Sequence, residues 1–173
     1  MSKAVMLSIR PKWCEKIASG EKTIEVRKTR PKMNTPFKCY IYCTQSGVAL
    51  GAWGKHGKVI GEFTCDRIDR LAPANEPYGI YDIDDDYVFQ TCLENGALWD
   101  YGHGIPLYGW HITDLRIYDA PRELSEFRRA CPNSWYCESC AMYWENNGTC
   151  GNESLQLKRA PQSWCYVEAM DNG

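Results

Sequence analysis

The chain lacks any apolar run that approaches the length of a membrane span. Its N-terminal residues also lack the apolar stretch of a secretory signal, so we expect a cytoplasmic protein that does not contact a membrane. Internal repeats and low-complexity segments are absent as well. The composition, 44% hydrophobic and 24% charged over 173 residues, is ordinary for a globular protein with a sizeable core.

Acidic residues are scarce in the first third of the chain. Residues 1–58 hold twelve Lys or Arg and three Asp or Glu, whereas residues 59–173 hold eight basic and nineteen acidic residues. The basic part indicates a surface for a polyanion, with candidates at Arg10, Lys12, Lys16, Lys28, Arg30, Lys32 and Lys38. Mixing of the two parts in the fold would disperse this charge instead. The overall pI of about 5.9 argues against tight, non-specific binding of nucleic acid.

A charged motif lies between a predicted helix and a predicted strand. Pro11 suits the first turn of a short helix, and Gly20 suits its end. β-branched residues then favour a strand, in which Glu25 and Arg27 share one face and Lys22 lies at the mouth. An ammonium, a carboxylate and a guanidinium together can bind a phosphate, polarise a base or transfer protons. The alternative is a solvated strand face with an ordinary surface ion pair.

This motif, Gly-x-Lys-x-x-Glu-x-Arg between a helix and a strand near the N-terminus, resembles the signature of the ASCH domain family. The four matching residues are Gly20, Lys22, Glu25 and Arg27. The opening strand at 5–9 and the segment 108–112 also resemble strands of that family. The resemblance spans about residues 3–120 and returns near 155–168. It implies an α+β fold, a PUA-like mixed β-barrel with short flanking helices.

Local patterns agree with a mixed fold, because strands and short helices alternate without a regular βαβ rhythm. Strands are expected over residues 3–9, 22–28, 37–44, 58–70 and 110–118, with a last one near 155–168. Helices are expected over residues 11–19, 84–95 and 121–129, the second of them ending at Gly96. The Gly-rich loop 45–57, which carries Trp53 and His56, is expected beside the pocket.

Four of the ten cysteines lie close together, at Cys131, Cys137, Cys140 and Cys150. A Cys-x-x-Cys turn with two further thiolates suits a structural Zn²⁺ ion, and this stretch holds too little apolar sequence for a core of its own. Disulfides, a redox pair or an iron–sulfur cluster are the alternatives. We therefore expect a barrel over 1–129 plus 154–170, with a small zinc-stapled loop module inserted at 130–153. The other six cysteines are expected to be buried apolar residues.

The family resemblance implies binding of RNA or a modified nucleotide. We expect the pocket to use Lys22, Glu25 and Arg27, with further contacts from Ser8, Arg10 and Trp164. Ser8 and Arg10 could instead cap a loop, and Trp164 could stack on a base or plug the barrel. His111 adjoins Trp110 on a strand, so only one of the two can face inward.

Some members of the family are hydrolases, acting on N4-acetylcytidine or on RNA phosphodiesters. The amidohydrolase members use the motif Lys, here Lys22, and a Thr nucleophile three residues later, where this chain has Glu25. Thr23 is the nearest hydroxyl, and Glu62 is a possible counterpart of the family's distant Glu. A different hydrolase would use Glu25 as general base and Lys22 to stabilise an oxyanion. A third hypothesis is a protein-interaction adaptor that uses the zinc loop.

Overall fold

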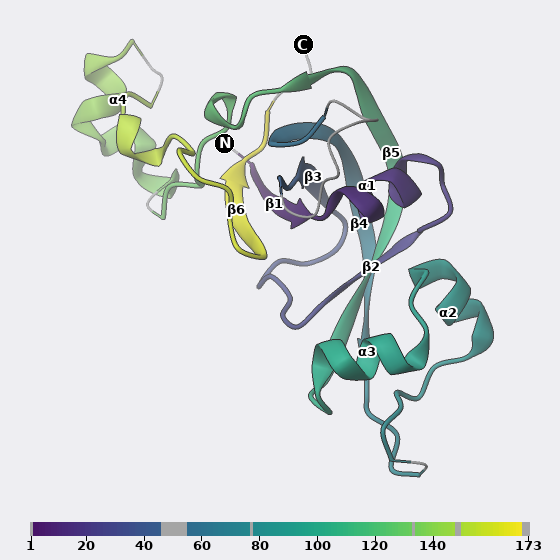
Figure 1. Ribbon diagram of the computed structural model, residues 1–173. Helices are drawn as coiled ribbons and strands as arrows, with labels where there is room; N and C mark the ends of the chain where they lie inside the picture. Colours follow the sequence, from purple (N-terminus) through teal and green to yellow (C-terminus); the bar gives the residue numbers. More distant parts are fainter. Residues whose placement is uncertain (1, 46–54, 77, 133, 148–149, 171–173) are drawn as a thin grey trace.

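The computed structural model describes residues 2–45, 55–76, 78–132, 134–147 and 150–170 (Figure 1). Its centre is a six-stranded sheet in the order β2-β5-β4-β3-β1-β6. The strands are β1 Lys3–Ile9, β2 Ile24–Arg27, β3 Phe37–Cys43, β4 Lys58–Leu71, β5 Leu107–Arg122 and β6 Trp164–Glu168. The helices are α1 Pro11–Ala18, α2 Asp85–Thr91, α3 Asn95–Gly102 and α4 Ala141–Glu145. Single 3₁₀ segments span Leu124–Glu126, Ser134–Ser139 and Glu153–Leu155.

The first half of the sheet follows the predicted elements closely. β1 pairs in parallel with β3 and antiparallel with β6, and the remaining strand pairs are antiparallel. Along β3, alternation places Cys39, Ile41 and Cys43 in one core cluster, whereas Tyr40 joins the cluster on the opposite face. Both faces of this strand are therefore covered, which explains why it is hydrophobic throughout.

Helix α1 covers one face of the sheet and ends where the sequence predicts. Cys14 and Ile17 are fully buried against β1 and β3, while Trp13 is only partly buried. Gly20 follows the helix with a φ of 81°, a left-handed conformation that glycine adopts without steric cost. The backbone N–H of Lys22 then donates to the Lys16 carbonyl at 2.9 Å, which turns the chain back towards the helix.

Two of the predicted helices are wrong. The predicted helix over 84–95 is two helices, because Cys92 adopts a φ of 54° and ends α2, and α3 begins at Asn95. Gly96 therefore lies in the first turn of α3 and is not a helix stop. The predicted helix over 121–129 is absent, because β5 stays paired with β4 as far as Arg122 and only one 3₁₀ turn follows.

The sheet is open, which corrects the expected closed barrel. β2 and β6 are its two edges, and within the described residues side chains span the gap between them. Arg27 Nη1 lies 3.4 Å from both the carbonyl oxygen and the Oγ of Ser163, and Trp164 Nε1 donates to Thr29 Oγ1 at 2.9 Å. Because the Arg27 guanidinium occupies this position, no backbone ladder joins the two strands there. The gap leaves room for a pocket at the sheet edge.

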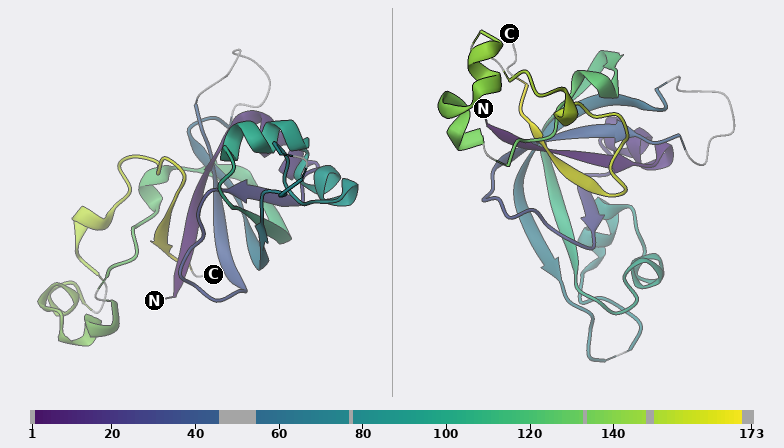
Figure 2. Two further views of the ribbon diagram at one scale, coloured as in Figure 1. Left: turned by 90° about the horizontal axis from the view of Figure 1, so that it is seen from below. Right: turned by 90° about the vertical axis from the view of Figure 1, so that its left-hand side faces the viewer.

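Helices α2 and α3 pack together over the end of the sheet formed by β2, β4 and β5 (Figure 1). Their cluster contains Val26, Leu71, Leu98 and Leu107. The segment that carries α4 lies on the other side of the molecule and projects from the sheet in both views of Figure 2. No helix among the described residues is long and apolar enough to cross a membrane.

Candidate functional site

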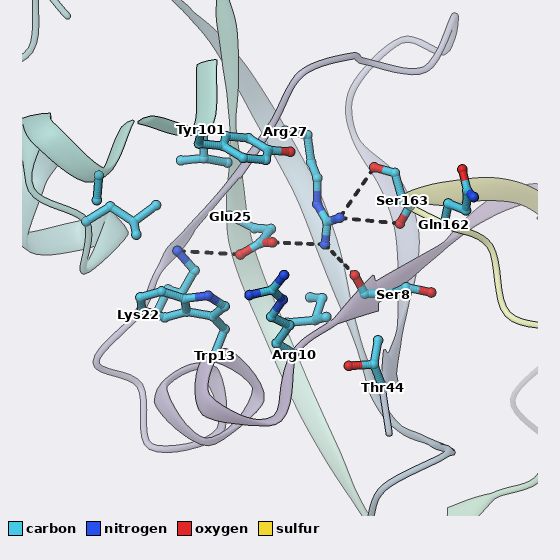
Figure 3. Close-up of a pocket in the computed structure, with 14 residues that line it drawn as sticks. Ser8, Arg10, Trp13, Lys22, Glu25, Arg27, Thr44, Tyr101, Gln162 and Ser163 are labelled. Atoms are coloured by element: carbon cyan, nitrogen blue, oxygen red, sulfur yellow. Dashed lines mark hydrogen bonds and ion pairs between the residues drawn. The ribbon is translucent and has the colours of Figure 1, made fainter. Parts of the chain in front are cut away.

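A cavity of about 560 Å³ opens at the sheet edge between β2, α1, α3 and the segment that precedes β6 (Figure 3). Its polar lining combines residues far apart in the sequence: Ser8, Arg10, Lys22, Glu25, Arg27, Thr44, Gln162 and Ser163. Two aromatic side chains, Trp13 and Tyr101, complete one side of it. The volume falls in the usual range for small-molecule sites.

The three charged motif residues form one buried ion-paired group in this cavity. Lys22 Nζ lies 3.4 Å from Glu25 Oε2, and Arg27 Nη2 lies 2.9 Å from Glu25 Oε1. The exposed fractions of Lys22, Glu25 and Arg27 are 2%, 6% and 7%. The interpretation as a solvated surface pair is therefore wrong. Charges removed from water to this degree are retained only with close partners, and here the carboxylate serves both cations.

Backbone carbonyls hold the two cations in place. Lys22 Nζ donates to the Thr91 carbonyl at 2.5 Å, where α2 ends. Arg27 Nη2 donates to the Ser8 carbonyl at 2.8 Å, where β1 ends. Three separate parts of the fold therefore fix the geometry of the group, and neither side chain can move without breaking a tertiary contact.

Burial is the main electrostatic influence on Lys22. Removal from water lowers the pKa of the Lys22 ammonium, and the neighbouring Glu25 carboxylate opposes this shift only in part. Arg27 adds a smaller effect in the same direction as burial. Lys22 thus loses its proton more readily than an exposed lysine.

Aromatic rings flank the charged group, and lysines accompany them. In the view of Figure 3, Tyr101 lies above Glu25 and Trp13 lies below it. Lys12 Nζ lies 4.3 Å from the centre of the Trp13 ring, and Lys28 Nζ lies 4.9 Å from that of Tyr101. Tyr101 remains 38% exposed, so part of its ring is accessible. Flat aromatic faces beside cations are suited to bases and phosphates.

The structure brings most of the predicted pocket residues together. Ser8 and Arg10 line the cavity with the charged group, and Ser8 Oγ also donates to the Pro161 carbonyl at 2.6 Å. Trp164 does not line it. At the start of β6, Trp164 pairs with Leu7 and packs on Trp110 and Tyr166, so its neighbour Ser163 faces the cavity instead. This placement matches the plug and not the stacking alternative.

Sequence reasoning missed Tyr101, because α3 was not predicted as a separate helix. The Gly102-His103-Gly104 stretch that follows was the available signal, since glycines mark helix ends. The loop expected beside the pocket is described only in part: Thr44 lines the cavity, and residues 46–54, including Trp53, lie outside the described residues. His56 is described, and its Nδ1 lies 3.8 Å from Cys43 Sγ.

The other residues considered for catalysis lie elsewhere. Glu62 on β4 accepts a hydrogen bond from the Tyr118 hydroxyl at 2.7 Å and does not line the cavity. Thr23 is also absent from the lining. His111 faces away from buried Trp110, as alternation requires, and its Nε2 lies 2.6 Å from Asp69 Oδ2. Neither Glu62 nor Thr23 therefore supplies the base or nucleophile that the amidohydrolase pattern needs.

The cysteines divide as the sequence suggests only in part. Cys14, Cys39, Cys43 and Cys65 are buried, whereas Cys92 and Cys165 are half-buried. The four clustered cysteines are free thiols. In the part of the chain that the structure describes, no three or more His, Cys, Asp or Glu side chains come together as a metal site. The zinc site stays a prediction.

Comparison with known proteins gives one family and one fold. The profile of the ASCH domain family matches residues 7–144. The crystal structure of ASCH from Zymomonas mobilis superposes with a TM-score of 0.59 at 17% identity, covering 95% of this chain and 87% of that one. Two single-residue variants of the Zymomonas mobilis protein are both 16% identical. They give TM-scores of 0.56, with 96% and 91% of the two chains covered, and 0.57, with 95% and 88% covered. No curated protein sequence matches.

Proposed function

The chain belongs to the ASCH domain family, which is associated with RNA binding, and from the geometry of its pocket we propose that it binds RNA through one nucleotide. The nucleobase, plain or modified, enters the cavity and meets the group of Lys22, Glu25 and Arg27. The observation that carries this proposal is the buried, ion-paired group at the wall of an open cavity.

The polar atoms of the group match the edge of a nucleobase. A base presents amino donors next to carbonyl and ring-nitrogen acceptors. The Glu25 carboxylate accepts from an exocyclic amino group, and the Lys22 ammonium donates to a neighbouring acceptor. Unpaired bases in RNA are typically recognised in this way, by hydrogen bonds to their edges and stacking on aromatic side chains.

The rim of the cavity supports the same conclusion. Tyr101 and Trp13 provide rings for stacking, and Lys12, Lys28 and Arg10 provide positive charge for flanking phosphates. Binding of a short single strand needs only these local cations, so it is compatible with the net charge of −2.

Hydrolysis of a nucleobase amide or an RNA phosphodiester is the second candidate. The lowered pKa of Lys22 favours it, because perturbed groups in a cleft are typical of catalytic sites. Against it, both oxygens of Glu25 already have cationic partners, so a water molecule must displace one of them to reach the carboxylate. Glu25 also stands where the amidohydrolase members have their nucleophile. Binding therefore remains the first proposal.

The binding proposal is tested with a fluorescently labelled single-stranded RNA of mixed sequence and the variant Tyr101→Ala. Loss of one stacking surface is worth about 1–3 kcal/mol, which is roughly a 5- to 150-fold rise in Kd by fluorescence anisotropy. Tyr78→Ala is the matched control, since Tyr78 is 83% exposed and does not line the cavity. Equal Kd values for both variants and the unmodified protein would count against the pocket.

The hydrolase candidate is tested on the same preparations. An RNA that contains N4-acetylcytidine is incubated with the protein and with Lys22→Ala, and its mass is measured before and after. Loss of the acetyl group, or shorter fragments, seen only with the unmodified protein would establish an enzyme. An unchanged mass together with pocket-dependent binding would leave a binding module.

A further inference from the structure

The segment 130–153 holds defined turns without a hydrophobic core. It carries the 3₁₀ segment Ser134–Ser139 and the five-residue helix α4, and it projects from the sheet (Figures 1 and 2). None of its residues with described burial is buried, and Trp144 and Met142 are 64% and 48% exposed. Helices this short are not stable in water without tertiary packing. Something other than apolar burial must hold the segment.

Two of its four cysteines lie on the projecting part, on one tight turn. The backbone N–H of Cys140 donates to the Cys137 carbonyl at 3.0 Å, and Cys140 then caps the start of α4. This hydrogen bond closes the Cys-x-x-Cys step into a single turn. A turn of this kind allows both thiolates to bind one ion.

The other two cysteines lie where the segment leaves and rejoins the sheet. Cys131 follows Ala130, whose N–H donates to the Tyr166 carbonyl of β6 at 3.1 Å. Cys150 Sγ lies 3.4 Å from Arg128 Nη2, which also donates to the Asn152 carbonyl at 2.7 Å. Contacts to the body of the protein therefore tie down the base of the segment near both thiols, while the Cys-x-x-Cys turn has no such contact.

We propose that residues 130–153 form a separate structural unit, in which the thiolates of Cys131, Cys137, Cys140 and Cys150 bind one Zn²⁺ ion. Four soft ligands suit zinc and leave no open position, so the ion is structural. Four thiolates and one zinc carry a net charge of −2, and the Arg128 guanidinium beside Cys150 partly offsets it. Ligation draws the Cys-x-x-Cys turn onto the two cysteines at the base, so metal binding and ordering of the unit are coupled.

The first measurement is the metal content of the full chain, purified without chelator and analysed by plasma mass spectrometry. About one zinc per chain is expected. Cys137→Ser and Cys140→Ser are each expected to lose most of it. Cys92→Ser is the matched control and keeps it, because Cys92 is a half-buried thiol outside the segment. Full zinc content in both of the first two variants would overturn the proposal.

A second measurement does not depend on the variants folding. Co²⁺ added to the metal-free, unmodified chain is expected to give the intense visible absorption of a tetrahedral thiolate site, and zinc is expected to abolish it. Failure to develop this spectrum under reducing conditions would overturn the proposal. An intact mass that shows two disulfides among the four cysteines in freshly purified protein would do so as well.

Discussion

Replacing Glu25 with Gln removes the one negative charge from the buried group while keeping its shape. Lys22 and Arg27, 2% and 7% exposed, then share a site without their common partner. Breaking a buried pair by removing one member costs about 3–5 kcal/mol, because an uncompensated charge remains. With native stabilities of about 5–15 kcal/mol, Glu25→Gln should lose a large part of the free energy of unfolding.

The pH dependence of this loss identifies its cause. Burial already lowers the folded-state pKa of Lys22, so the unfolded chain binds more protons than the folded one. Stability therefore rises as the pH increases from the lowered folded value towards the unfolded value of about 10.4. Without Glu25, which opposes the shift, the folded pKa falls further and the rise begins at lower pH. The defect of Glu25→Gln should shrink in alkaline buffer.

Urea unfolding followed by tryptophan fluorescence at neutral and alkaline pH measures both effects. The matched control is Glu21→Gln, which removes an exposed partner of Lys16 at 2.8 Å in the same stretch of chain. The midpoint for that variant should stay close to that of the unmodified protein, because exposed ion pairs contribute little. Equal midpoints for the two variants, or a Glu25→Gln defect that is independent of pH, would refute the reasoning.

Three further predictions concern the surroundings of the group. Arg27→Lys keeps the charge but loses the contacts with Ser163, so amide hydrogens of β6 should exchange faster by mass spectrometry, while an unchanged rate would mean that the edges are held otherwise. Gly102→Ala places a methyl group against the buried Tyr81 hydroxyl and should destabilise the protein by about 1–3 kcal/mol, measured as a lower urea midpoint; an unaltered midpoint would contradict the close contact. Lys28→Ala should lower the slope of log Kd for RNA against log salt concentration by about one, and an identical slope would place the phosphates elsewhere.

Local features of the site could be predicted because short-range rules fix them. Gly20 ends α1 with a positive φ, and the two-residue repeat of a strand puts Glu25 and Arg27 on one face. The positions of β1 and β3 follow from the same alternation, and the family resemblance rested on this motif. Burial of the charged group could not be predicted, because it depends on α2 and β1 supplying carbonyls from residues far along the chain.

By itself, the sequence determined the helix–turn–strand that carries Lys22, Glu25 and Arg27, because each step depends on neighbours only a few residues away. Only the tertiary structure decided that the sheet stays open and that Ser163, not Trp164, faces the pocket. It also brought Tyr101 to the cavity, since the position of α3 depends on the end of α2 at Cys92 and on packing against Val26 and Leu107. The chemistry of the site is thus written in one short motif, whereas its enclosure depends on long-range packing.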